Sequence, residues 1–276
     1  MNIVDEISHI TSILKDHYID HPEIEARLIL SHILAVNLKD IYLYDLPIPE
    51  RQVKQIEEIV KRRTTGIPLQ YLLGEVEFFD MIINVGEGVF IPRPETELMT
   101  EYAIKEIKGH SPLVLDICTG SGCIALAIAK QKKGSFVVGT DISEIALRYA
   151  KGNAKRNKIN NVSFVRCDLF APFKDGVFDV IISNPPYISS NDIKFLQREV
   201  QKEPLIALDG GDDGLDFYRR IINNISHLMK SGGVIILEIG FNQSKEVFGI
   251  VKENTFSEVR IIKDYAGIDR ILIARR

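Results

Sequence analysis

The architecture of this chain can be inferred from one continuous segment, Leu113-Val114-Leu115-Asp116-Ile117-Cys118-Thr119-Gly120-Ser121-Gly122-Cys123-Ile124-Ala125. Its first half is mostly apolar, which is typical of a strand buried on both faces of a sheet. Gly120 and Gly122 then let the backbone approach a ligand and leave the start of the next helix open to it. A strand, a glycine-rich turn and a helix in this order predict an open α/β sheet with a ligand site at the turn.

Two further strand patterns end in carboxylates. The apolar run 136–140 leads into Asp141, where a carboxylate can accept both hydroxyls of a ribose. The run 162–167 leads into Asp168, which could meet the amino group of an adenine. Three successive strands therefore bring glycine-rich or acidic loops to one edge of the sheet, which indicates a nucleoside site.

A fourth strand, Phe178-Asp179-Val180-Ile181-Ile182, runs into Ser183-Asn184-Pro185-Pro186-Tyr187. Two consecutive prolines must stop the strand, so a rigid loop follows at its carboxyl end, where open α/β sheets bind ligands. The Asn184 side-chain oxygen and the Pro185 carbonyl can accept the two N–H groups of an amide or aromatic amine, and Tyr187 offers a flat face for stacking. Because the lone pair of such a nitrogen is delocalised, catalysis by this loop would come from positioning. The loop predicts methylation of a planar amino group.

Two other interpretations compete with this one. Gly120-x-Gly122-x-x-Ala125 also satisfies the looser dinucleotide fingerprint, and Asn-Pro-Pro-Tyr alone could be a turn beside a core tyrosine. A hydride-transferring enzyme has no use for the Asn-Pro-Pro-Tyr loop, and no catalytic His or Tyr-Lys pair is evident. The combination favours S-adenosylmethionine over NAD.

Composition narrows the class of protein. The 276 residues are 45% hydrophobic and carry a formal net charge of −4, which gives no basic footprint for sequence-independent nucleic-acid binding. We expect a cytoplasmic protein, because no apolar run approaches the roughly 20 residues of a membrane span and no secretory signal is evident. The three cysteines, Cys118, Cys123 and Cys167, lie in or beside apolar segments without metal-ligand spacing, so we expect reduced thiols and no metal.

The chain is expected to have two parts. Residues 1 to about 65 show helical periodicity, with one apolar stripe from Ile3 to Leu14 and a helix from Pro49 to Arg63. Short β segments between residues 71 and 85 suggest a hairpin. A helix is expected over 191–200. The last two strands, 259–263 and 270–274, are too close for a crossover helix and should pair antiparallel, giving a mostly parallel seven-stranded sheet with one antiparallel member.

The segment from Phe90 to Glu97 combines a helix start with an arginine between two prolines. Pro94 suits the first position of a helix, and Glu95 and Glu97 suit its positive end, which explains these residues without any function. Arg93 lies between two prolines in a stiff frame. The sequence leaves open whether this segment lines the cofactor pocket.

Taken together, these motifs resemble the HemK/PrmC family. The resemblance covers nearly the whole chain in order and is carried by Ile91-Pro92-Arg93-Pro94-Glu95-Thr96-Glu97, Asp116-Ile117-Cys118-Thr119-Gly120-Ser121-Gly122, Ser183-Asn184-Pro185-Pro186-Tyr187-Ile188, Glu203-Pro204, Asp213-Gly214-Leu215 and Glu238-Ile239-Gly240. Members of this family are protein-(glutamine-N5) methyltransferases that modify the glutamine of the Gly-Gly-Gln loop of class I peptide chain release factors.

The resemblance implies a class I, Rossmann-like methyltransferase domain over 84–276 and a substrate-binding helical domain with a linking hairpin over 1–83. It also assigns roles in binding S-adenosylmethionine to Cys118, Thr119, Gly120, Ser121, Gly122, Asp141, Asp168, Leu169 and Asn184. The glutamine amide would be held by Asn184 and Pro185 in a slot shaped by Pro186 and Tyr187. Cys118 departs from the glycine that many relatives carry before the threonine, and its side chain could narrow the backbone approach to the cofactor.

Three alternatives remain at this point. An adenine N6-methyltransferase of DNA or RNA shares the Asn-Pro-Pro-Tyr chemistry but should have a basic recognition region, which is not evident here. A glutamine methyltransferase of a ribosomal protein uses the same loop and differs only in overall resemblance. A cofactor-binding module without transferase activity would have no need for Asn184 and Tyr187.

Overall fold

The computed structural model describes residues 2–43, 47–170 and 173–276. The chain forms two compact units, Met1–Gly74 with Gln197–Lys202 and Glu75–Leu196 with Glu203–Arg276. These units differ in two ways from the predicted domains, 1–83 and 84–276. The hairpin lies in the second unit, and residues 197–202 belong to the first. The division of roles between those two ranges stays a prediction. Within the described residues, no helix combines the length and apolar character that a membrane span requires.

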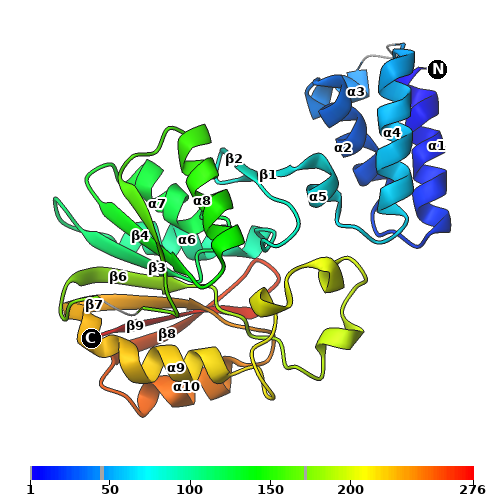
Figure 1. Ribbon diagram of the computed structural model, residues 1–276. Helices are drawn as coiled ribbons and strands as arrows, with labels where there is room; N and C mark the ends of the chain where they lie inside the picture. The colour runs from blue at the N-terminus through cyan, green and yellow to red at the C-terminus, as the bar shows by residue number, and fades with distance from the viewer. Residues whose placement is uncertain (1, 44–46, 171–172) are drawn as a thin grey trace. The chain divides into compact units, whose positions relative to one another are not determined.

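The first unit is helical, and its helices are coloured blue to cyan in Figure 1. They are α1 (Ile3–Asp16), α2 (Pro22–Leu34), α3 (Leu38–Leu43), α4 (Glu50–Arg63) and α5 (Leu69–Leu73). The predicted helix after Pro49 is confirmed as α4. The apolar stripe of α1 is buried, since Ile3, Ile10 and Leu14 are at most 1% exposed. These side chains share a core with buried residues of α2 and α4 such as Leu30.

A buried cation holds the distant segment in the first unit. The side chain of Arg63 is 3% exposed, and its Nε and Nη2 donate to the two oxygens of Glu25 at 2.7 and 2.9 Å. Its Nη1 donates to the Ile67 carbonyl at 3.2 Å, and Nη2 also pairs with Glu199. The guanidinium therefore joins α2, α4 and residues 197–202.

The helix expected over 191–200 is absent. The structure has only the 3₁₀ turns η1 (Ile193–Phe195) and η2 (Val200–Lys202) in this region. Between them, Glu199 pairs with Arg63. The side chain of Arg198 lies beside Gly66, so close that a Cβ added to this glycine would be 3.4 Å from the Arg198 Cβ. These contacts with distant residues outweigh a local helix preference, which is only a weak influence.

The second unit contains the predicted hairpin and the predicted sheet. The hairpin is β1 (Glu75–Phe78) with β2 (Met81–Asn84). The seven strands of the sheet lie in the order β5-β4-β3-β6-β7-β9-β8. They are β3 (Leu113–Ile117), β4 (Phe136–Asp141), β5 (Val162–Arg166), β6 (Phe178–Ser183), β7 (Met229–Glu238), β8 (Ser257–Lys263) and β9 (Asp269–Arg275). Among these seven strands, β9 runs opposite to the other six, which confirms the single antiparallel member.

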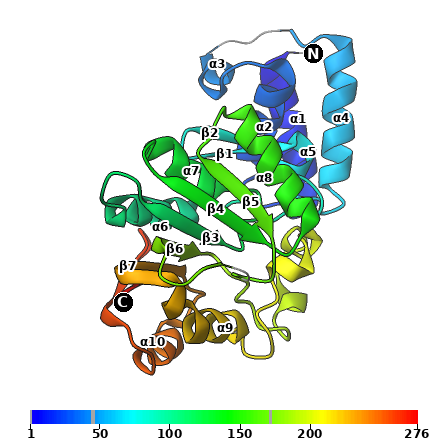
Figure 2. The same ribbon diagram turned by 60° about the vertical axis from the view of Figure 1, so that its left-hand side comes forward.

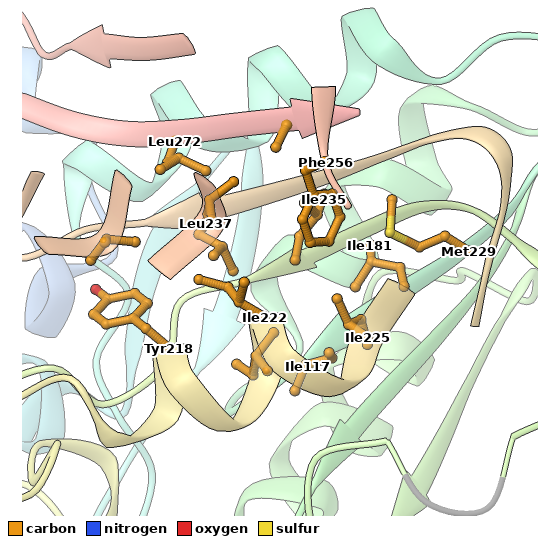
Figure 3. Close-up of a cluster of buried hydrophobic side chains, with 14 of the residues drawn as sticks. Ile117, Ile181, Tyr218, Ile222, Ile225, Met229, Ile235, Leu237, Phe256 and Leu272 are labelled. Carbon is orange, nitrogen blue, oxygen red and sulfur yellow. The ribbon is translucent and has the colours of Figure 1, made fainter. Parts of the chain in front are cut away.

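Helices cover both faces of this sheet, as Figures 1 and 2 show. One face carries α6 (Pro94–Glu106), α7 (Cys123–Gln131) and α8 (Glu144–Arg156), and the other carries α9 (Asp216–Ile225) and α10 (Ser244–Lys252). Two 3₁₀ turns flank α9 in the sequence, η3 (Leu205–Ala207) before it and η4 (Ser226–Leu228) after it. Figure 3 shows Ile222 and Ile225 of α9 packed against Ile181 and Ile235 of the sheet, all fully buried. The strand order reverses between β3 and β6, and such a switch point is where sheets of this type bind ligands.

Candidate active site

A pocket opens in the second unit at the carboxyl ends of the central strands. It encloses about 1050 Å³ of empty space, counted to its open mouth. Most residues that the sequence singled out line it, namely Cys118, Thr119, Gly120, Ser121, Asp141, Asp168, Leu169, Asn184, Pro185, Pro186 and Tyr187. Gly122 does not line the pocket. A Cβ there would come within 3.0 Å of the Ala150 Cβ and 3.1 Å of the Phe164 ring, so this glycine lets α7 start close to α8 and β5.

The buried carboxylate of Asp116 stabilises the glycine-rich turn through two hydrogen bonds. Asp116 Oδ2 accepts from the Thr119 hydroxyl at 2.6 Å and from the Ala125 N–H at 3.2 Å. Burial raises the pKa of Asp116 to about 7. Cys118 has a left-handed backbone, with φ +60°, a conformation in which glycine is unstrained and other residues are uncommon. This is the physical reason why a glycine suits the position that Cys118 occupies.

Asp141 connects the ends of β3 and β4. Its Oδ2 accepts from the Gly120 N–H at 2.9 Å and its Oδ1 accepts from the Ser143 N–H at 2.8 Å. Burial raises the pKa of this carboxyl above its ordinary value, against the effect of these hydrogen bonds. A carboxylate has about four lone-pair sites, so the group can still accept from a ligand.

The predicted adenine contacts after β5, Asp168 and Leu169, have different surroundings. Asp168 lines the pocket but is exposed, and its Oδ2 pairs with Arg220 of α9 at 2.7 Å. One oxygen is therefore already engaged by a protein cation. Leu169 is buried with φ +58°, and its carbonyl accepts from the Thr140 hydroxyl at 2.6 Å.

The Asn-Pro-Pro-Tyr loop is fixed at both ends. Before it, the Ser183 hydroxyl donates to the Ile117 carbonyl at 2.8 Å, which joins β6 to β3. After it, the Ile188 N–H donates to the Leu208 carbonyl at 3.0 Å. The Tyr187 carbonyl accepts from Gln243 Nε2 at 2.9 Å. A loop restrained in this way can hold a substrate group in one position.

The sequence assigned no definite role to several residues beside this loop. Phe90, Pro92 and Thr96 line the pocket, which answers the question left open for their segment. Arg93 does not line it and pairs with the buried Glu203, whose Oε2 accepts from the Ile91 N–H at 3.0 Å. Glu238 is fully buried at the end of β7, and its place after a long apolar run was a signal for a special role. Thr96 belongs to the motif 91–97 that carries the family resemblance, but no role was predicted for it.

Comparisons with known proteins agree with this geometry. The sequence model of the family described as Methyltransferase domain matches residues 111–265, and that of the PrmC N-terminal domain matches residues 6–74. A methyltransferase structure from Pyrococcus furiosus superposes with a TM-score of 0.55 at 22% identity, covering 71% of this chain and 89% of that one. This likeness confirms the Rossmann-like methyltransferase fold.

Curated relatives match over most of their length. The release factor glutamine methyltransferase of Thermodesulfovibrio yellowstonii is 43% identical over 256 residues, covering 91% of this chain and 92% of the relative. That of Fusobacterium nucleatum is 40% identical over 268 residues, covering 95% and 76%. The resemblance inferred from the sequence motifs is confirmed. The chain belongs to the family of release factor glutamine methyltransferases, which use S-adenosylmethionine as methyl donor.

Proposed function

We propose that this protein transfers a methyl group from S-adenosylmethionine to the side-chain amide nitrogen, N5, of the glutamine in the Gly-Gly-Gln motif of class I peptide chain release factors. The observation that carries the proposal is the position of Asn184 and Pro185, two acceptors on a restrained loop, in the same pocket as Asp141 and the glycine-rich turn. The names of the relatives support the choice of a release factor as substrate.

The pocket residues fit S-adenosylmethionine. A Cβ added to Gly120 would meet no atom within 4 Å, so the backbone is open to a ligand there. The free lone pairs of Asp141 suit the two hydroxyls of a ribose, and Leu169, Ile142 and Phe217 give the pocket an apolar wall for a flat base. When bound, the cofactor supplies a methyl group on a positively charged sulfur.

The chain's own groups would orient the acceptor. The Asn184 Oδ1 and the Pro185 carbonyl accept the two N–H bonds of the glutamine amide and thereby fix its plane. The nitrogen lone pair, perpendicular to that plane, then faces the methyl group, while Tyr187 closes one side of the slot. The amide nitrogen would take the methyl group that the cofactor supplies and would lose one proton to solvent. No strong base is required.

Substrate and location follow from the same proposal. We propose that the helical N-terminal unit grips the body of the release factor, since a large protein needs contacts beyond one glutamine. Because ribosomes terminate translation in the cytoplasm, the enzyme would act there. The proposal needs no nucleic-acid substrate and no metal.

The test is intact-mass and peptide mass spectrometry of a purified release factor incubated with this protein and S-adenosylmethionine. We expect one added methyl group on the glutamine of the Gly-Gly-Gln motif, and none when that glutamine is replaced by alanine. Duplex DNA and a ribosomal-protein fraction are incubated in parallel. Methyladenine in the DNA, or a methylated glutamine in a ribosomal protein, without modification of the release factor would contradict the proposal.

Asp141 provides a test of the cofactor assignment. Asp141→Ala removes two acceptors for ribose hydroxyls, each worth about 1.5 kcal/mol as a charge-assisted hydrogen bond, so the dissociation constant for S-adenosylmethionine should rise about a hundredfold. Isothermal titration calorimetry measures this constant directly. Glu144→Ala, which removes an exposed carboxylate three residues away, is the matched control and should leave the affinity unchanged. Equal affinities for the two variants would show that Asp141 does not bind the ribose.

A further inference from the structure

The register of two central strands brings a buried carboxylate next to the substrate loop. Ser183 of β6 pairs with Leu237 of β7, so the next residues lie at the same level: Asn184 directly follows β6, and Glu238 is the last residue of β7. Helix α6 packs against both strands, with Thr96 in its first turn. Thr96 and Glu238 are each only 2% exposed.

These three side chains form a chain of hydrogen bonds. The Thr96 hydroxyl donates to Glu238 Oε2 at 2.7 Å, and Asn184 Nδ2 donates to the Thr96 oxygen at 3.3 Å. A hydroxyl has a single proton, and here that proton is donated in the hydrogen bond to the Glu238 carboxylate. Only lone pairs of the Thr96 oxygen therefore face Asn184, so the NH₂ group of the carboxamide must lie on that side.

The opposite end of the carboxamide is left for a ligand. With Nδ2 held by Thr96, Oδ1 of Asn184 lies on the other side, and within the described part of the chain no group donates to it. Asn184 also lines the pocket. A reversed carboxamide would instead present N–H groups to a substrate amide that itself needs acceptors.

We propose that Thr96 and Glu238 are positioning residues that fix the orientation of the Asn184 carboxamide, so that its oxygen faces the amide nitrogen to be methylated. This inference rests on the proposed function and adds two residues to its machinery. Thr96 and Glu238 act through Asn184, because the orientation of one carboxamide decides whether the substrate meets an acceptor or a donor.

The direction of the chain depends on the charge of Glu238. An ionised Glu238 can only accept, whereas a protonated one can donate to Thr96 and release the hydroxyl proton toward Asn184. Burial raises the pKa of Glu238 to about 7, opposed by its hydrogen bond with Thr96 and by the Arg270 cation. The turnover number should therefore fall as the pH is lowered through about 7. The groups that act on or contact Glu238 come from every neighbouring element: Glu95 and Thr96 of α6, Cys123 of α7, Tyr187 of the loop, Tyr218 of α9 and Arg270 of β9.

Substitutions at Thr96 test the proposal, with Thr100 as the matched control. Thr100 is equally buried one turn later on α6, and its hydroxyl donates to the Thr96 carbonyl at 2.8 Å. Thr96→Val should lower kcat on the release factor about tenfold, with the KM and the cofactor Kd nearly unchanged. Thr96→Ser restores the hydroxyl and should restore kcat, and Thr100→Val should leave kcat near the wild-type value. A parallel loss of cofactor affinity, or equal losses in Thr96→Val and Thr100→Val, would overturn the inference.

Two further measurements test the inference. The first does not depend on the identity of the substrate, and the second does not depend on the folding of the Thr96 variant. In protein labelled with ¹⁵N-asparagine, the Asn184 side-chain NH₂ signal should shift in Thr96→Val and stay in place in Thr100→Val, whatever the substrate is. An unmoved Asn184 signal would overturn the inference, while an unmodified release factor with wild-type protein would overturn only the proposed function. In Glu238→Gln the acid limb of the kcat profile near pH 7 should disappear. Its persistence would assign that limb to another group, such as Asp116, and contradict the role of Glu238.

Discussion

Asn184→Ala should lower kcat for methylation of the release factor by about a hundredfold or more, because it removes one of two acceptors that fix the reacting nitrogen. The cofactor Kd should change little, since the remaining polar groups of the pocket, Asp141 and the glycine-rich turn, stay in place. Single-turnover kinetics with isothermal titration of S-adenosylmethionine separates these two quantities. The loop itself should persist, because Ser183 and Ile188 restrain it through other partners.

The comparison for this variant is Asn160→Ala. Asn160 is an exposed asparagine shortly before β5 and does not line the pocket, so its replacement should leave kcat and the cofactor Kd unchanged. If Asn184→Ala lost affinity and turnover by the same factor, its role would be to shape the pocket, and the positioning of the amide would have to come from another group.

Arg63→Met should lower the free energy of unfolding of the first unit by about 3–5 kcal/mol, the usual effect of removing one partner from a buried ion pair. The methionine keeps most of the apolar volume but leaves Glu25 and Glu199 facing each other without a cation. Urea unfolding followed by circular dichroism measures the loss. Hydrogen exchange should show faster exchange of α2 and of residues 197–202 than in the native protein.

The neighbouring Arg62→Met is the natural control. Arg62 lies on the same helix, carries the same charge and is exposed, so its replacement should change the free energy of unfolding by less than about 0.5 kcal/mol. Similar losses in the two variants would mean that the ion pairs of Arg63 contribute nothing beyond helix stability.

The fold could be predicted because its strands are continuous apolar runs. Segments such as 113–117 and 178–182 are buried on both faces of a parallel sheet, and the short connection between β8 and β9 required antiparallel pairing. The helix expected over 191–200 was wrong, since Glu199 binds Arg63 far away in sequence. A local pattern contains no information about such a partner.

The candidate site was predicted where strand ends carry unusual residues. The loops after β3, β4, β5 and β6 meet in one pocket, as the shared edge of parallel strands requires. Thr96 was missed because a threonine in the first turn of a helix is ordinary, and its importance arises only from the packing of α6 on two strand ends. Gly122 does not line the pocket, and a Cβ there would meet Ala150 and Phe164, so its contact with the cofactor stays a prediction.

The inclusion of residues 197–202 in the first unit bears on how this protein is made. When residue 74 leaves the ribosome, Arg63 has Glu25 but not Glu199, and the missing segment is synthesised on the order of ten seconds later. The N-terminal unit therefore reaches its final structure only after most of the second unit has emerged. A gene fragment for residues 1–74, grafted onto another methyltransferase, would encode a unit in which the buried Arg63 keeps Glu25 but lacks Glu199.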